Sequence, residues 1–125
     1  MQNVSPMLEF APGWCLAVDD DARWLFVRLA TANERYSEPE LADAVDGLAR
    51  QRGRFRVVFE MAADLILHSH LVGELVVLHK RLCLQGGALR LCGFTEYNLE
   101  VIRMMQLTDR FHNYPDRQAA VAGGG

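Results

Sequence analysis

The sequence predicts an α/β fold in which a small mixed β-sheet is covered by α-helices, mainly on one face. The first indication is a pair of apolar strands, 54–60 and 88–94, that flank a helix with short connections at both ends. A short helical crossover of this kind joins neighbouring parallel strands. The second indication is a pair of apolar runs, 15–18 and 24–29, separated by a few acidic residues, which is typical of an antiparallel hairpin. Strands of both directions predict a mixed sheet.

The helices are predicted from start signals, apolar spacing and stop signals. Ser37-Glu38-Pro39-Glu40 resembles a capping box, with Ser37 and Glu40 exchanging bonds at a helix start and Gly53 marking the end. In the central helix, leucines recur at spacings of three and four residues, at Leu71, Leu75, Leu78 and Leu82. Gly86-Gly87 then provides the left-handed stop.

The C-terminal third is predicted to continue the alternation of helices and strands. Thr95 is the predicted N-cap of a helix whose apolar face includes Leu99 and Ile102. A short last strand is expected within 111–114, followed by a helix from Asp116 to Ala122.

The chain has 125 residues and a mass of 14.1 kDa, which is enough for one core without disulfides or metal. We expect a loose N-terminal segment over 1–13, one domain over 14–122 and a flexible glycine tail over 123–125.

Charge and hydropathy exclude several classes of partner. The net charge of −3 and the pI near 5.8 argue against nucleic acid, because phosphate-backbone binding needs a basic face. No apolar run reaches the roughly 18–20 residues that span a bilayer, so direct membrane insertion is not expected. The first residues lack the pattern of a signal peptide, which favours a cytoplasmic location.

The cysteines and aspartates do not predict a structural metal. Cys15, Cys83 and Cys92 are odd in number and far apart, which favours reduced thiols over a disulfide framework or a zinc site. The run Asp19-Asp20-Asp21 lacks the alternating ligand pattern and distal glutamate of a calcium loop, so a solvated turn is expected.

The most informative polar residue is Ser69, which precedes the central helix. Exposed N–H groups and the positive end of the helix dipole lie at such a position, so a phosphate on Ser69 would meet a favourable field. The alternative is that Ser69 is only an N-cap, which would stabilise the helix by ~1 kcal/mol.

The histidines on either side of Ser69 suggest a different kind of site. His68 and His70 could ligate a metal together with an acidic group such as Asp64, as in a small metal-dependent enzyme. However, no His-Glu-x-x-His pattern and no Gly-x-Ser-x-Gly elbow is present. We therefore expect no catalytic residue, no metal and no cofactor.

Several segments resemble the STAS domain, the fold of anti-sigma factor antagonists. They are Val57-Val58-Phe59-Glu60, the loop with Ser69, Gly73, the stretch Leu78-His79-Lys80-Arg81-Leu82, the stretch from Gly86 to Gly93, and Leu107 to Phe111. The resemblance implies that Ser69 matches the family's phosphoacceptor serine and Gly73 its second motif glycine. His68 stands where the family has aspartate, His70 where it has a second hydroxyl residue, and Leu71 where it has the first glycine.

The resemblance also implies a function and a partner. We expect a non-catalytic regulatory module that binds an anti-sigma factor or serine kinase-like protein and is switched by phosphorylation of Ser69. The predicted partner-binding residues are Asp64, His68, Ser69, His70, Leu71, Val72 and Glu74. A binder without a switch, a STAS subunit that binds an ABC-type ATPase in lipid transport, and the metal-dependent enzyme are the alternatives. A homodimer is a further option, because strand 15–18 is predicted to lie at a sheet edge.

Overall fold

The computed structural model describes residues 7–31 and 38–123 of the chain. Six strands and four helices follow one another in the order β1 (Met7–Ala11), β2 (Trp14–Asp20), β3 (Trp24–Thr31), α1 (Leu41–Arg52), β4 (Arg56–Met61), α2 (Ser69–Leu84), β5 (Ala88–Cys92), α3 (Glu96–Met104), β6 (Asn113–Tyr114) and α4 (Arg117–Ala122). In this part of the chain no helix is long and apolar enough to cross a membrane.

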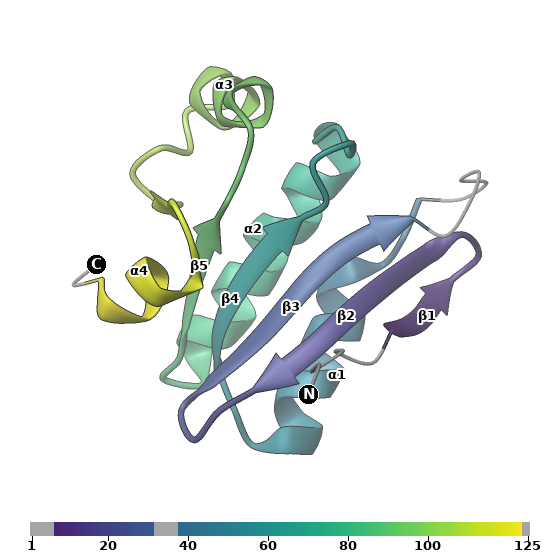
Figure 1. Cartoon of the computed structure of the whole chain (residues 1–125), viewed down its shortest axis with the longest axis vertical. Helices are drawn as coiled ribbons and strands as arrows, with labels where there is room; N and C mark the ends of the chain where they lie inside the picture. Colours follow the sequence, from purple (N-terminus) through teal and green to yellow (C-terminus); the bar gives the residue numbers. More distant parts are fainter. Residues whose placement is uncertain (1–6, 32–37, 124–125) are drawn as a thin grey trace, which may run out of the picture.

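The strands form one mixed sheet whose spatial order is the order of the sequence (Figure 1). β1, β2 and β3 are antiparallel neighbours, whereas β3, β4, β5 and β6 run parallel to one another. The parallel pairs are joined through α1, α2 and α3, as crossover connections require. The predicted fold class is confirmed.

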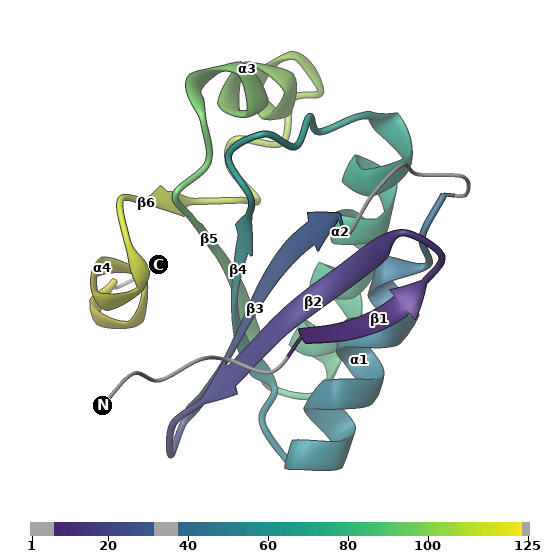
Figure 2. The ribbon, with the colours of Figure 1, turned by 45° about the vertical axis from the view of Figure 1, so that its right-hand side comes forward.

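The two faces of the sheet are covered unequally. Alternating side chains of β3 and β4, such as Val27 and Phe59, are fully buried in the main core beneath α1 and α2. The short helix α4 lies on the opposite side of the sheet, where Ala120 packs with Trp24, Val58 and Cys92 (Figure 2). Most of the helical cover is therefore on one face.

Helix α2 carries the predicted leucine stripe into the core. Each of its four stripe leucines is at most 1 % exposed. Gly86 adopts a φ of 75°, which confirms the left-handed stop. Gly87 has a different role: a Cβ there would collide with the backbone of Phe55, so only glycine lets β5 begin this close to the residues that lead into β4.

The N-terminal segment differs from the expectation of a loose start. Residues 7–11 form β1, which pairs with β2 across the turn at Pro12 and Gly13. Gly13 has a φ of 80°, and its amide donates to Glu9 Oε2 at 3.2 Å, which closes the hairpin. Strand 15–18 is consequently an interior strand between β1 and β3, so the predicted edge for a homodimer is wrong.

Two further predictions about element ends need correction. Helix α1 begins at Leu41 with Glu40 as its N-cap, so Glu40 does not act as the third residue of a capping box. Ser37 lies outside the described residues. At the C-terminus, Gly123 is part of the packed structure, because a Cβ there would meet the ring of Tyr114.

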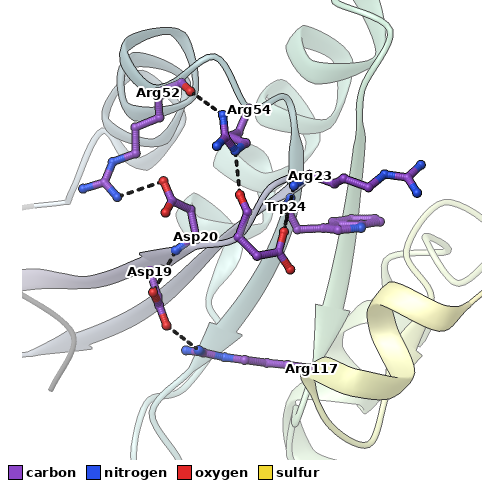
Figure 3. A network of polar contacts seen from close by, with 8 residues as sticks. Asp19, Asp20, Arg23, Trp24, Arg52, Arg54 and Arg117 are labelled. Atoms are coloured by element: carbon purple, nitrogen blue, oxygen red, sulfur yellow. Dashed lines mark hydrogen bonds and ion pairs between the residues drawn. The ribbon is translucent and has the colours of Figure 1, made fainter. Parts of the chain in front are cut away.

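The three consecutive aspartates have different partners, and Figure 3 shows those of Asp19 and Asp20. Asp19 lies 3.9 Å from Arg117, and Asp20 pairs with Arg52 at 3.2 Å. Asp21 accepts the backbone amides of Arg23 and Trp24, and these bonds lower the pKa of its carboxyl group. The run therefore ends β2 and builds the turn into β3.

Candidate functional site

Ser69 is the first residue of α2, not its N-cap. The N-cap is His68, whose extended backbone (φ −113°, ψ 175°) turns the chain into the helix. Ser69 is exposed, and its hydroxyl makes no hydrogen bond within the part of the chain that the structure describes. The simple explanation of Ser69 as a capping residue is therefore wrong by one position.

The loop before Ser69 is held in place by the buried side-chain amide of Asn98. Asn98 of α3 is 1 % exposed, accepts the amide of Leu67 at 2.9 Å and donates to the carbonyl of Leu65 at 3.0 Å. Leu65 and Leu67 point into the core, and Ile66 between them is 53 % exposed. The loop thus has a fixed shape that presents Ile66 and the residues after it to solvent.

Exposed residues of this loop and of one stripe of α2 together define a candidate surface. Ser69, Gly73 and Val77 follow one another at spacings of four residues and are all exposed. Asp64, Ile66 and His68 precede them on the loop and are also exposed. We call this set the α2-start surface: Asp64, Ile66, His68, Ser69, Gly73 and Val77.

Gly73 has no packing role in the described structure. A Cβ added at Gly73 would meet nothing within 4 Å, and its φ is not in the left-handed region. Glycine in the interior of a helix costs roughly 0.5–1 kcal/mol relative to alanine. The fold alone would therefore favour a larger residue at this position, one turn from Ser69.

The prediction of partner binding is wrong for two residues. Leu71 and Val72 are each 1 % exposed and belong to the core under the sheet, so they cannot contact a partner. The helical period explains this, because Leu71 lies on the leucine stripe and not on the stripe of Ser69.

His70 and Glu74 are occupied inside the molecule. The Nε2 of His70 donates to the carbonyl of Pro39 at 2.7 Å, and its Nδ1 lies 3.4 Å from a carboxylate oxygen of Glu38. Glu74 accepts the backbone amide of Ala42 at 2.8 Å. Both side chains fasten the start of α2 to the start of α1, and both are only partly exposed.

The amino end of α2 differs electrostatically from those of the other helices. Thr95 caps α3 through the amide of Asn98, Asp116 caps α4 through the amide of Ala119, and Glu74 accepts from the amide of Ala42 in α1. No side chain among residues 7–31 and 38–123 accepts from the first amides of α2. Among the described residues, these N–H groups therefore have no side-chain acceptor, and groups of this kind favour a negatively charged ligand.

The same histidines do not assemble a metal site. The rings of His68 and His70 are 6.3 Å apart, and both ring nitrogens of His70 face oxygen atoms of the α1 start. Within the described ranges, no group of three or more His, Cys, Asp or Glu side chains is arranged to hold a metal ion. The geometry thus gives no support to the metal-dependent enzyme.

Sequence reasoning missed Asn98, Ile66 and the exposure of Val77. A signal for Asn98 was present, because an amide four residues before Ile102 lies on the apolar face of its helix. A polar residue in that place needs buried partners, and exposed backbone groups of a neighbouring loop are the usual ones. Ile66 gave no signal, since three consecutive apolar residues, 65–67, are equally typical of a fully buried segment.

Comparisons with known proteins support the architecture. No family model and no curated protein matches the chain. Among solved structures, the NMR structure of the protein TM1081 aligns with a TM-score of 0.70 at 14 % identity, over 84 % of each chain. An anti-sigma-factor antagonist (STAS) domain protein from Planctomyces limnophilus aligns with a TM-score of 0.63 at 22 % identity, over 86 % of this chain and 95 % of that one. The chain therefore has the fold of a STAS domain, as its sequence motifs predict.

Proposed function

We propose that this protein is a non-catalytic regulatory module that binds a serine kinase or anti-sigma factor through the α2-start surface. In this proposal it works in the cytoplasm as an anti-sigma factor antagonist. The support comes from the STAS fold and from the position of Ser69, exposed at the first turn of α2 beside amides that no side chain of the described residues caps.

The observation that carries the proposal is the pairing of Ser69 with Gly73. Both are exposed on one stripe, and nothing in the described structure explains a glycine at position 73. A macromolecule that approaches the helix backbone closely does explain it, because a methyl group would hold that macromolecule away. The buried position of Leu71 adds to this, since its bulk does not cover the stripe.

Phosphorylation of Ser69 would act as a binding switch. The phosphate adds about −1.5 to −2 charges next to the positive end of the helix dipole, so the fold tolerates it. A partner docked over the same spot would have to desolvate a dianion, which weakens the complex unless a cation of the partner receives it. The switch needs no change of fold.

The sharpest test compares two glycines. Gly47 in α1 is also exposed, and a Cβ there also meets nothing within 4 Å. We expect Gly73→Ala and Gly47→Ala each to raise the free energy of unfolding by up to ~1 kcal/mol. Only Gly73→Ala should weaken binding to a cognate anti-sigma kinase, by at least tenfold in calorimetry. Equal affinity of both variants would show that no partner approaches Gly73.

A second test addresses the switch itself. Ser69→Glu should reduce affinity for the kinase, while Ser69→Ala should keep affinity and abolish the mass increase seen on incubation with kinase and ATP. Thr108→Glu is the matched control, because it adds the same charge at an exposed position in the segment after α3. Unchanged affinity of Ser69→Glu would leave a binder without a switch. Capture of an ABC-type ATPase in place of a kinase would change the partner class.

A further inference from the structure

The outer edge of β5 is only half covered. β6 contains two residues and pairs with β5 only at Leu91 and Cys92 (Figure 2). The amides of Leu91 and Gly93 donate to the carbonyls of His112 and Tyr114 at 3.1 and 2.9 Å. The preceding part of β5, from Ala88 to Arg90, pairs with β4 and has no strand on its other side in the described structure.

The backbone of Leu89, a residue that is 5 % exposed, has no strand partner on the β6 side among the residues described. Alternate residues of a strand direct their N–H and C=O groups to the same side. The Leu91 and Gly93 amides point toward β6, and the Ala88 amide points the other way, to Phe55 O at 3.1 Å. The amide and carbonyl of Leu89 thus face the side of β6, and the register assigns them no strand partner among the residues described.

A groove runs along this open edge. It has a volume of about 530 Å³ and is lined by residues 87–90, by His79 and Cys83 of α2, and by Asp109, Arg110 and His112 of the segment before β6. A second hollow of about 470 Å³ continues from it and shares His79, Cys83 and Arg110. It extends to Leu84, which at 85 % exposure is the most exposed large apolar residue described. We call the two together the β5-edge groove.

The charge of the groove is opposite to that of the whole protein. Lys80 and Arg110 line it and have no ion pair in the part of the chain that the structure describes, while Asp109 is its one carboxylate. Arg90 directs its guanidinium elsewhere, to Ala120 O at 2.6 Å and over the ring of Trp24. Burial and the charge of Arg110, which lines the groove beside His79, lower the pKa of His79.

We propose that the β5-edge groove binds an extended acidic segment of a partner protein, which adds to the sheet as a strand beside β5. Backbone groups of the segment pair with Leu89, a carboxylate lies between Lys80 and Arg110, and an apolar side chain covers Leu84. The α2-start surface lies at the other end of α2, so this site does not depend on Ser69. The protein would then hold two partners, or two parts of one partner, at opposite ends of one helix.

The test uses the full chain and three synthetic peptides of equal length. The acidic probe is acetyl-Val-Glu-Val-Glu-Val amide, the charge control replaces both glutamates with lysine, and the backbone control replaces the central valine with proline. We expect the acidic peptide alone to shift the amide NMR signals of Leu89 and Arg110 and to slow hydrogen exchange of the Leu89 amide at least fivefold. Equal shifts with the lysine or proline peptide would overturn the proposal.

A pair of arginine variants tests the charge. Arg110→Ala should weaken binding of the acidic peptide at least fivefold, whereas Arg28→Ala should not. Arg28 is a suitable control because it is exposed on β3, on the face of the sheet opposite the main core. Equal affinity of the two variants for the acidic peptide would contradict the proposal that the peptide binds in the β5-edge groove.

The reactivity of the Cys83 thiol provides an independent test of where the peptide binds. It is the exposed cysteine of the three, while Cys15 and Cys92 are buried and burial beside Glu60 raises the pKa of Cys92 to about 12. N-ethylmaleimide should therefore modify Cys83 first. The acidic peptide should slow this reaction at least threefold, and prior modification should block the peptide. A Leu89 signal that changes with protein concentration alone would assign the edge to a second copy of the chain and overturn the proposed partner.

Discussion

The amino ends of α1 and α2 lie against each other but are stabilised in different ways. Among the first amides of α1, that of Ala42 donates to the carboxylate of Glu74 in the neighbouring helix, at 2.8 Å. Those of α2 receive no described side chain, and the loop before them is held instead by Asn98, 31 residues further along the chain. One helix start is closed by the protein, and the other is positioned but left open.

The difference shows where the protein is less stable than it could be and leaves a helix start accessible. An open helix start forgoes a cap worth ~1 kcal/mol, and an interior glycine one turn later forgoes roughly 0.5–1 kcal/mol more. Both omissions fall on the exposed stripe of α2, beside Ser69. A capped start is expected for a helix that only packs against the rest of the protein. An uncapped start is expected for a helix that a partner contacts.

The largest expected effect comes from removing the support of the open start. Asn98→Ala leaves the amide of Leu67 and the carbonyl of Leu65 without their buried partner, at ~1–3 kcal/mol for each group that water cannot reach. We expect a loss of ~2–4 kcal/mol in urea denaturation and faster hydrogen exchange of the Leu67 amide. A loss below 1 kcal/mol would mean that the loop keeps its shape without Asn98.

The second effect concerns the closed start. Glu74→Ala removes the acceptor of the Ala42 amide and should lower the free energy of unfolding by ~1 kcal/mol, with faster exchange of the α1 amides. Glu74→Gln keeps an acceptor oxygen and should lose less than half of that. Glu100→Ala, which breaks an exposed pair with Arg103, is the control and should change stability by less than 0.5 kcal/mol. Equal losses for all three would contradict a specific role of Glu74.

The smallest expected effect is that of a substitution that adds an N-cap to the open start of α2. His68 already has the extended backbone of an N-cap, so His68→Asp supplies a carboxylate that can accept from the α2 amides. We expect a gain of ~0.5–1 kcal/mol at pH 7. These bonds lower the pKa of the new carboxyl in the folded state, so the gain holds above the unfolded value of about 3.9 and is lost as pH falls through the folded pKa. A gain that persists at pH 2 would exclude this capping mechanism.

The fold was largely predictable because its signals are local. The leucine spacing of α2, the stop at Gly86 and the cap at Thr95 each involve residues within a few positions of one another, and the structure confirms all three. β1 also had a local signal in the turn Pro12-Gly13, which the expectation of a loose segment overlooked.

The candidate site was only partly predictable because its contacts are distant. Within 64–74, the helical period alone places Leu71 on the buried leucine stripe. The contact between Glu74 and the amide of Ala42 joins positions 32 residues apart, so this stretch does not reveal it. The bonds between Asn98 and the loop join positions more than 30 residues apart, and no local pattern could pair them.

The spatial order of the strands has a consequence for how the chain folds. Each strand pairs with the strand that precedes it in the sequence, from β1 to β6. The antiparallel pairs β1–β2 and β2–β3 close short turns, whereas the parallel pairs β3–β4 and β4–β5 join residues 32 positions apart, such as Trp24 and Arg56, so the hairpins have the smaller loop-closure cost. The sheet can grow strand by strand as the polypeptide leaves the ribosome, and the open groove beside β5 is then where its growth stops.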